Sequence, residues 1–590
     1  MIPVKKINFL VISIAFLLVY FFIFVEPFFP NINGNLGHDY EIWFPRMLAG
    51  DYYFYTNGLS VVPWFTPSFC GGTLLYSNPQ YLFYSIPQFL NFYLNPILSI
   101  KVTIMLFSSL GFLGFYITLK NLFNMSKGAA IFGSILFLFN GFYAYRMIIG
   151  HLSYHSFMLL PLISYYLFIP TQNNNHYKDI ALGVLAAIFM SYIVYSGGVH
   201  LVIPICLSLL AILFLARIFD KGFQLSIKRI LLFSIATLTI TASKISASFA
   251  TLSNLPRDYY PLPGIDNIFY SLWVPLKSIF FSAYTSIDTN KIFTNSMWTI
   301  DKHEMEYSLT FIPLILIVYG LCFLVKNKPI INKLEQILIV LLFILCLIPI
   351  AINFYNPYWN LFLKQIPIIK NSIMLVRWYV LYIPIVIILS SKVIDKIENK
   401  KYILPLLIVL IIFIKLFEDK NYYQNQTYNP QAAIYSHSKL IQTKNVPSIK
   451  EITSKDMITT NEGKSFTSGD LIMSEGLSRI NCNESLFGYR HEDFKKKSLL
   501  RDEASIFNLI NGKFNMKNPA CYIFPKENKC EIGDHFKYEQ IKELRQFSEY
   551  RGYNFKKPLS QKLFNWLSPI MLFLCLSYLV FFSFIRLKSS

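Results

Sequence analysis

The chain has 590 residues, of which 54% are hydrophobic and only 15% are charged, and its mean hydropathy is +0.44. Such a chain cannot bury all of its apolar surface in a water-soluble core, which excludes a soluble globular protein and favours one that crosses a membrane several times. The net charge of +20 does not indicate nucleic-acid binding, because the basic residues cluster in short loops beside apolar runs. The positive-inside rule and anionic headgroups account for them there.

Twelve apolar runs are predicted to form spanning helices. They are residues 7–25, 98–119, 129–143, 152–169, 180–195, 199–216, 230–250, 308–325, 334–352, 373–391, 402–417 and 563–585. The first run resembles a signal peptide, but its length and the lack of a small-x-small cleavage motif favour a retained anchor. With a cytoplasmic N-terminus, every short basic cluster and the basic C-terminal tail fall in the cytoplasm. We therefore expect an α-helical polytopic membrane protein with both termini cytoplasmic.

This topology places four segments outside the cytoplasm. They are a large first loop (26–97), loops of about 251–307 and 353–372, and a polar segment from 418 to 561. The last is long enough to be a small domain with its own core, and its short strand-like and turn-rich stretches predict a mixed α/β fold. Residues 1–417 then form the membrane domain, and residues 562–590 form a final spanning helix and a cytoplasmic tail.

Cysteine placement agrees with this sidedness. Four cysteines lie in apolar runs, where a thiol usually packs as a small hydrophobe. The other four, in the outer segments, are Cys70, Cys482, Cys521 and Cys530. Cys521 and Cys530 are close enough in sequence to close a short disulfide loop in an oxidising compartment. The competing interpretation is a metal site, and no CxxC or paired-histidine spacing supports it.

The stretch from residue 38 to residue 88, in the first outer loop, is the most informative. It combines acids, aromatics, Gly and Pro and shows no helical apolar period. Ordered loops of this length are usually functional, although an ordered cap without chemistry is the alternative. His38, Asp39 and Glu41 follow directly on the first apolar run, where a lipid phosphate and a water-side substrate can meet. A carboxylate there either takes the proton from an attacking hydroxyl or is simply solvated.

An acid in the first outer loop, a dozen helices and an exported soluble domain together resemble the GT-C superfamily of integral membrane glycosyltransferases. The run PWFTPSFCGGTLLYSNPQYLFYSIPQ is similar to the YfhO-like branch, in which the acid is followed by a loop of the W-x-P, G-G-x-P and N-P-Q type. Those places are taken by Trp64 and Pro67, by Gly71 and Gly72, and by Asn78 to Gln80. Leu74 stands where proline is expected, which is a small departure.

The resemblance implies transfer of a hexosyl or pentosyl group from a polyprenyl-phosphate donor, with inversion at the sugar carbon. The acceptor would be an envelope glycan such as lipopolysaccharide, a lipid or a protein. Asp39 corresponds to the general base, with Glu41 in reserve. The first-loop residues expected to line the substrate site are His38, Trp64, Asn78 and Gln80. The many Lys, Asn and Ile residues are typical of an AT-rich bacterial genome, which favours the bacterial inner membrane with the site facing the periplasm.

In that mechanism a fixed cation at the outer face neutralises the departing lipid phosphate. Arg377, near the outer start of a predicted helix, is the first candidate. The others are Arg146, Arg257 and Lys244, the last lying unusually deep in an apolar run. Snorkelling to the interface is the alternative for each of them. His151 and His155 follow Arg146 in YRMIIGHLSYH and are expected to line the same site.

The segment WTIDKHEMEYS precedes another predicted helix. His303 and Glu304 resemble the start of a zinc-protease HExxH motif, but Tyr307 replaces the second histidine, which argues against that class. We expect four residues of this segment to line the outer cavity or to coordinate a divalent cation: Asp301, His303, Glu304 and Glu306. The alternative is that they are solvated residues at a helix start, where acids are favoured.

Two other classes compete with the transferase. A transporter or flippase for lipid-linked glycans predicts internal repeats and broken helices that meet at midplane charges, and only Lys244 lies that deep. A non-catalytic factor for envelope glycan assembly would leave the charge of the first loop free to vary. An oligosaccharide polymerase or ligase would share the donor chemistry.

Overall fold

The computed structural model describes residues 4–171, 176–255, 261–281, 289–296, 300–327, 332–370, 372, 374–398, 400–455, 457–459, 465–467, 472–480 and 499–589. Arg257, one of the predicted phosphate-binding residues, and Cys482 lie outside the described residues.

Helices make up most of the described chain. The α-helices are α1 (Val4–Tyr20), α2 (Tyr40–Asn57), α3 (Ile86–Leu90), α4 (Pro96–Ile117), α5 (Lys127–Leu138), α6 (Gly141–Ile149), α7 (Leu160–Phe168), α8 (His176–Tyr195), α9 (Val202–Phe219), α10 (Ile227–Asn254), α11 (Ile268–Phe280), α12 (Thr289–Ile292), α13 (Ile312–Asn327), α14 (Lys333–Ile352), α15 (Pro357–Leu363), α16 (Pro367–Lys370), α17 (Tyr382–Lys396), α18 (Lys400–Phe417), α19 (Asn421–Gln424), α20 (Gln431–Thr443), α21 (Ala520–Ile523), α22 (Ile541–Ser548) and α23 (Leu559–Ser589). Two segments are π-helices, η1 (Phe21–Val25) and η2 (Thr118–Leu122). The 3₁₀ helices are η3 (Leu152–Leu159), η5 (Val199–Leu201), η6 (Lys302–Met305), η7 (Leu375–Leu381), η8 (Ile472–Glu475) and η10 (Tyr538–Gln540).

Eight described helices are long and apolar enough to cross a membrane. They are Pro96–Leu122, Lys127–Ile149, His176–Tyr195, Val199–Phe219, Ile227–Asn254, Lys333–Ile352, Leu375–Lys396 and Leu559–Phe584. Large apolar side chains point outward from them, such as Phe343 on α14 and Phe573 on α23, which are 63% and 70% exposed. Such an outer surface suits a lipid bilayer, so the protein is a helical membrane protein.

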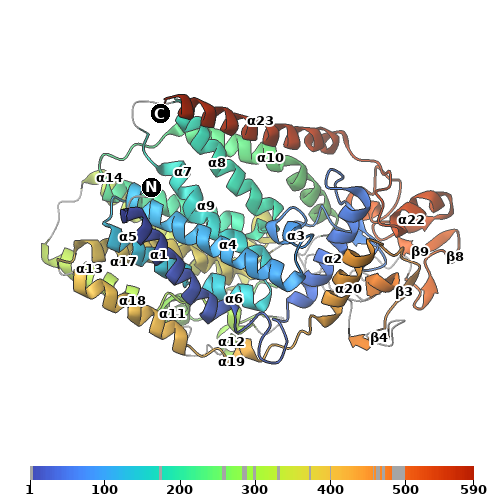
Figure 1. Ribbon diagram of the computed structural model, residues 1–590, viewed down its shortest axis with the longest axis horizontal. Helices are drawn as coiled ribbons and strands as arrows, with labels where there is room; N and C mark the ends of the chain where they lie inside the picture. The colour runs from blue at the N-terminus through green and yellow to red at the C-terminus, as the bar shows by residue number, and fades with distance from the viewer. Residues whose placement is uncertain are drawn as a thin grey trace.

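Helix α23 runs along the long axis of the molecule, other long helices such as α4, α8 and α10 are inclined to it, and strands β3, β4, β8 and β9 lie at one end (Figure 1). Along one side of the bundle, α10 packs between α8 and α23. Elsewhere α5 contacts α4, α17 and α18. A Cβ added to Gly133 of α5 would lie 2.5 Å from the Ser391 hydroxyl of α17, so these two helices approach closely because position 133 has no side chain.

Two predicted helices differ in form from the prediction. The run 129–143 is divided, because the Asn140 side chain accepts a hydrogen bond from the Tyr143 amide and begins α6 as its N-cap. The run 152–169 is the 3₁₀ turn η3 followed by the nine-residue α7, whose second residue is Pro161. Proline is favoured in the first turn of a helix and disfavoured further inside, which places the start of α7 there.

The segment predicted as the first outer loop contains a long helix, α2, which the sequence pattern did not predict. Its residues from Trp43 through Phe54 are buried all round, so it has no polar face to reveal a period. The buried Asp51 carboxylate accepts a hydrogen bond of 2.7 Å from Gln88 Nε2 and another from Asn91 Nδ2. These contacts fix α2 against α3, and burial raises the pKa of Asp51 well above its ordinary value.

The segment after α18 forms small sheets beside short helices, as a mixed α/β domain would. The strands are β3 (Glu451–Thr453), β4 (Met457–Thr459), β5 (Ser465–Thr467), β6 (Leu477–Arg479), β7 (Ala504–Ser505), β8 (Leu509–Ile510), β9 (Lys513–Lys517) and β10 (His535–Lys537). β3 pairs in parallel with β6 and antiparallel with β7. The other three-stranded sheet is antiparallel, and its strand order is β10-β9-β8. β4 pairs antiparallel with β5.

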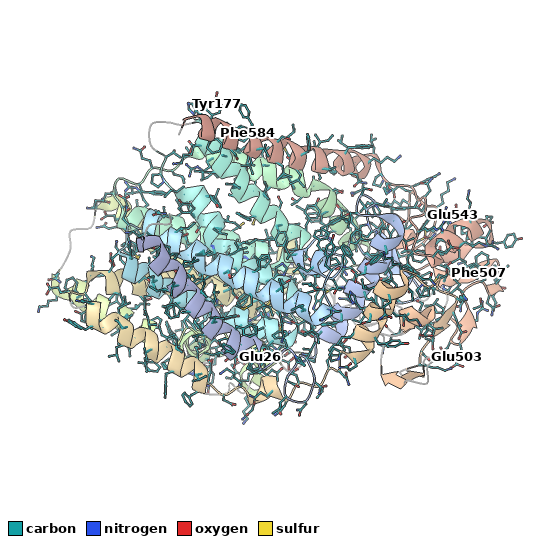
Figure 2. The ribbon with its side chains drawn as sticks, viewed as in Figure 1. Glu26, Tyr177, Glu503, Phe507, Glu543 and Phe584 are labelled. Carbon is teal, nitrogen blue, oxygen red and sulfur yellow. A yellow bond between two sulfur atoms is a disulfide. The ribbon has the colours of Figure 1, made fainter. Side chains whose placement is uncertain are left out.

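This domain shares one core with the first outer loop. Trp64, beside the short hairpin β1 (Phe65–Thr66) and β2 (Thr73–Leu74), packs with Phe524 and Phe555. Cys521 and Cys530 are joined by a disulfide, and Cys70 of the first loop is also disulfide-bonded. Figure 2 shows Glu503, Phe507 and Glu543 of this domain at one end of the molecule, far from Tyr177 and Phe584.

Candidate active site

Two glycines bring the start of the first outer loop against the end of α6. A Cβ on Gly37 would lie 2.2 Å from the Ile148 carbonyl oxygen, and one on Gly150 would lie 2.5 Å from the Tyr40 nitrogen. Gly150 also has a φ of +116°, which ends α6 in the left-handed region. The Asp39 amide donates to the Ile149 carbonyl at 3.0 Å. Asp39 and His151 therefore lie side by side although they are far apart in the sequence.

The Asp39 carboxylate is half-buried and is held by histidines. Its Oδ2 lies 2.7 Å from His151 Nε2, and its Oδ1 lies 3.7 Å from His38 Nε2. Burial acts to raise the pKa of Asp39, but the charge and hydrogen bond of His151, with smaller effects of His38 and His303, lower it to about 2. Asp39 is therefore ionised at neutral pH and 21% exposed, so that a ligand can reach it.

A gradient of exposure runs through the cluster. The side chains of His38 and Asp301 are 39% and 47% exposed at its rim. His303 is buried below them, and burial lowers the pKa of its imidazole well below the ordinary value. The His303 ring lies 4.9 Å from the His151 ring and 5.8 Å from the His38 ring, measured between centroids. The rim is therefore polar and open, and its floor is closed.

Below this floor, one buried glutamate binds two arginines. Arg146 Nη2 donates to Glu304 Oε2 at 3.0 Å, and Arg377 Nε donates to the same oxygen at 3.0 Å. Arg377 Nη2 donates to Glu304 Oε1. Burial works to raise the pKa of Glu304, but the two guanidinium groups hold it well below its usual range. Because two cations face one carboxylate, this triad keeps a net positive charge.

Aromatic rings surround the triad. The Arg146 guanidinium lies 4.2 Å from the Phe142 ring centroid and 5.2 Å from that of Tyr307. Tyr154 lies between the two arginines, 5.4 Å from Arg146 and 5.7 Å from Arg377. These cation–π contacts stabilise charges that are largely removed from water.

Two overlapping groups of side chains have the composition of a metal site. In each, the possible ligand atoms lie within 4.8 Å of one another. One group is His38, Asp301 and His303, and the other is Asp39, His151 and His303. The sequence named Asp301 and His303 as possible cation ligands, and the fold adds the histidines from two other segments.

Six of the predicted site residues meet in this cluster. They are His38, Asp39, Arg146, His151, Glu304 and Arg377. Glu41 lies two residues after Asp39 on the first turn of α2, with its side chain exposed.

Other predicted site residues have structural contacts instead. Both ring nitrogens of His155 are hydrogen-bonded, to the Leu152 carbonyl and to the Tyr192 hydroxyl. Lys244 Nζ donates to the Asn78 carbonyl at 2.8 Å and also to that of Tyr76. Lys244 therefore fixes the loop that carries the N-P-Q motif.

The remaining predicted lining residues belong to that loop and to the core of the outer domain. The Asn78 side chain accepts from the Gln80 amide at 3.0 Å, which shapes the turn. Trp64 is only 8% exposed and packs within the aromatic core shared with the outer domain. Their contacts here are those of scaffold residues.

The sequence did not suggest Tyr422 and Gln426, which the structure brings to the cluster. Gln426 Oε1 lies 2.7 Å from His38 Nδ1, and the Tyr422 hydroxyl lies 3.4 Å from His303 Nδ1. Both belong to NYYQNQTYNP, a segment whose composition is that of a linker. This segment reaches η6 only because the chain turns back after α18, so no local sequence pattern could have indicated that Tyr422 and Gln426 belong to the site.

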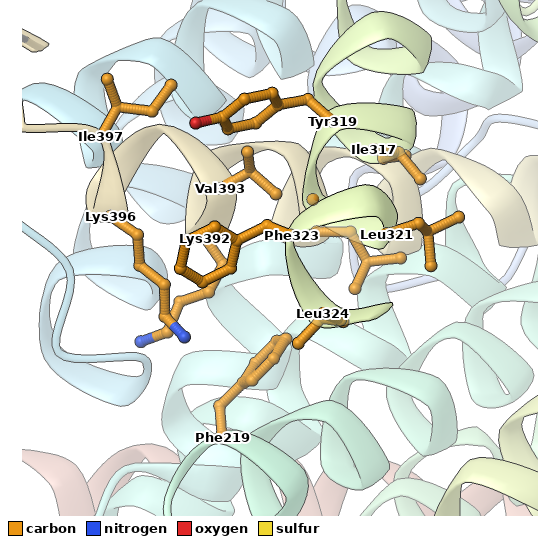
Figure 3. Close-up of a pocket in the computed structure, with 12 residues that line it drawn as sticks. Phe219, Ile317, Tyr319, Leu321, Phe323, Leu324, Lys392, Val393, Lys396 and Ile397 are labelled. Atoms are coloured by element: carbon orange, nitrogen blue, oxygen red, sulfur yellow. The ribbon is translucent and has the colours of Figure 1, made fainter. Parts of the chain in front are cut away.

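A separate apolar pocket of about 180 Å³ lies between α9, α13 and α17 (Figure 3). The residues that line this pocket include Phe219, Phe323, Lys392 and Lys396. Arg377 precedes α17, whose pocket-lining residues begin at Leu389, so roughly 20 Å of helix separates this pocket from the cluster. No protein family, curated protein or solved structure matches the chain. The function of the site is therefore inferred from its geometry.

Proposed function

We propose that the chain is an integral membrane glycosyltransferase of the GT-C type, with Asp39 as its general base. One observation carries the proposal: the half-buried Asp39 carboxylate and a largely buried, net positive Arg146–Glu304–Arg377 triad belong to one cluster. His303 links them, since its Nε2 lies 3.7 Å from Glu304 Oε1 and its ring packs on His151. A base beside an anion-binding group is what transfer from a phosphate leaving group requires.

In the proposed reaction, the hydroxyl oxygen of an envelope glycan, lipid or protein attacks the anomeric carbon of a sugar carried on polyprenyl phosphate. The bond from that carbon to the phosphate oxygen breaks, and its electron pair leaves with the lipid phosphate. The hydroxyl proton passes to Asp39, and attack from the face opposite the phosphate inverts the sugar carbon. Oδ2 of Asp39 is already bonded to His151, so Oδ1 is the atom that receives the proton.

We assign the leaving phosphate to Arg377. Its side chain is 26% exposed, whereas that of Arg146 is fully buried. Arg377 donates to Glu304 through Nε and Nη2, which leaves Nη1 for the phosphate. Arg146 acts through Glu304, whose orientation it fixes, and is a positioning residue.

The same proposal includes the twelve-helix topology, with both termini in the cytoplasm of a bacterial inner membrane and the cluster outside. Two observations support it. The two ends of the described chain lie at one end of the molecule, away from the strands of the outer domain (Figure 1). The Cys521–Cys530 disulfide of that domain suits an oxidising compartment.

The test is mass-spectrometric profiling of envelope glycans in a deletion strain complemented with wild type, Asp39→Asn or Glu41→Gln. Deletion should remove one sugar, and wild type should restore it. Asp39→Asn keeps the size of the side chain but removes the base, so the rate at which the sugar reappears should fall at least about 100-fold.

Glu41→Gln is the matched control, because it neutralises an exposed acid two residues away and should restore the sugar fully. Full restoration by a normally expressed Asp39→Asn protein would show that Asp39 is not the base. A deletion that changes no envelope glycan would contradict the transferase itself.

A further inference from the structure

Beside the Asp39–His151 pair, three side chains from two segments, His38 of one and Asp301 and His303 of the other, converge without bonding to each other. His38 Nε2 lies 3.9 Å from Asp301 Oδ2, which is beyond hydrogen-bond distance. A ligand atom of His303 lies within 4.8 Å of both. Ligands 2.0–2.1 Å from a tetrahedral ion are roughly 3.3 Å apart, so small side-chain movements would close this group around one cation.

The hydrogen bonds behind His38 determine which of its nitrogens carries a proton. Gln426 Nε2 donates to the Tyr422 carbonyl at 2.9 Å, so its Oε1 is the atom that faces His38. That oxygen also accepts from the His38 amide at 3.1 Å. Because Oε1 can only accept, His38 Nδ1, 2.7 Å away, must be the donor. A second hydrogen-bond partner that fixes the tautomer in this way is typical of a metal-binding histidine.

We propose that His38, Asp301 and His303, which we call the His38 site, bind one divalent transition-metal cation of the zinc type. Two imidazoles and one carboxylate form a ligand set that suits zinc better than magnesium or calcium, which prefer oxygen ligands. Three protein ligands leave a coordination position open, and the exposed rim of His38 and Asp301 gives a ligand access to it.

The second candidate group, Asp39 with His151 and His303, is less suited to the ion. Asp39 Oδ2 and His151 Nε2 already satisfy each other at 2.7 Å. A cation between them would have to break that bond. The His38 site therefore leaves the Asp39–His151 pair intact beside it.

The presence of the ion does not depend on the glycosyltransferase activity, but its role does. If the proposed function holds, a divalent cation at the His38 site would bind the acceptor hydroxyl or an oxygen of the donor phosphate next to Asp39. His38, Asp301 and His303 would hold it, and Gln426 would position His38.

The experiment measures zinc on the full-length protein, purified in detergent, stripped with a chelator, reloaded with zinc and desalted. Wild type should retain about one zinc per chain by elemental mass spectrometry, as expected for a single site. Asp301→Asn and His38→Gln should each weaken zinc binding at least about tenfold. Both side chains are partly exposed, so these variants should fold, and size-exclusion profiles check that they do.

Two control variants separate the possible outcomes. His155→Gln changes a buried histidine outside the group, and Asp39→Asn removes the nearby base; both should keep the zinc. Wild type that retains no zinc, or Asp301→Asn and His38→Gln proteins that bind it as tightly as wild type, would overturn the proposal. Loss of zinc in Asp39→Asn alone would move the ion to the other group. Glycan profiling is a separate readout, so failure of either proposal leaves the other testable.

Discussion

Replacing Glu304 by glutamine should strongly destabilise the outer end of the helical bundle. The Glu304 side chain is 4% exposed and is the carboxylate shared by Arg146 and Arg377. Removing one partner of a buried ion pair costs about 3–5 kcal/mol, because the other charge stays buried without compensation. The Arg146 side chain is fully buried and bears this cost in full, whereas the partly exposed Arg377 recovers some of it by hydration.

The glutamine oxygen still accepts one hydrogen bond, which offsets about 1 kcal/mol. The expected net loss is therefore about 3 kcal/mol. At about 2 °C per kcal/mol, the apparent melting temperature should fall by about 6 °C.

The assay is thermal unfolding in detergent, followed by intrinsic fluorescence. Glu41→Gln is the matched control, since an exposed carboxylate should contribute no more than about 0.5 kcal/mol. If Glu304→Gln melts within a degree or so of Glu41→Gln, the arginines are not held by this glutamate and the triad is wrong.

Two further changes test the surroundings of the site. Burial raises the pKa of Glu306 to about 8, so the folded chain binds this proton more tightly than the unfolded one. Stability from Glu306 is therefore full below about pH 4.5 and is lost as pH rises toward 8, by up to about 1.4 kcal/mol per pH unit. Glu306→Gln should flatten the fall in melting temperature over this range, and an unchanged slope would contradict the assignment. In the outer domain, replacing Cys521 and Cys530 together by serine should cost about 2–3 kcal/mol. Unreduced tryptic digests should contain the two cysteines in one linked peptide, and free thiols at both would refute the link.

The presence of most helices could be predicted from sequence, because long apolar runs have few other uses. Their ends could not. The helix α2 is buried from Trp43 through Phe54, so its sequence has neither a polar face nor a continuous apolar run. The helix α11 lies in a segment that was predicted to be a loop. Its Phe269 and Trp273 side chains are 79% and 48% exposed. Such a face suits the membrane interface rather than a span.

The site was predictable as a set of candidates but not as an arrangement. Arg146, Arg377 and Glu304 each stood out as a charge beside an apolar run. Nothing local indicates that Glu304 would bind both arginines, because the contacts join residues far apart in the sequence. Lys244 shows the converse: its depth suggested a functional cation, yet two backbone carbonyls of the N-P-Q loop bind it. Whether a buried charge serves a ligand or the fold depends on partners that only tertiary structure supplies.

The balance of charges in the cluster connects the two proposals. Two guanidinium groups face three carboxylates there, those of Glu304, Asp39 and Asp301, so the arginines and acids together carry one negative charge. A lipid phosphate approaching such a site would be repelled over several ångströms in a medium of low polarity. A divalent cation at the His38 site changes the net charge to one positive and leaves Asp39 ionised beside it. Without that ion, Arg377 is the partly exposed cation that faces both the phosphate and the carboxylates of Asp39 and Asp301. In the proposed transferase, the metal would therefore attract the lipid phosphate, and it would offset the negative charge of the acids beside Asp39.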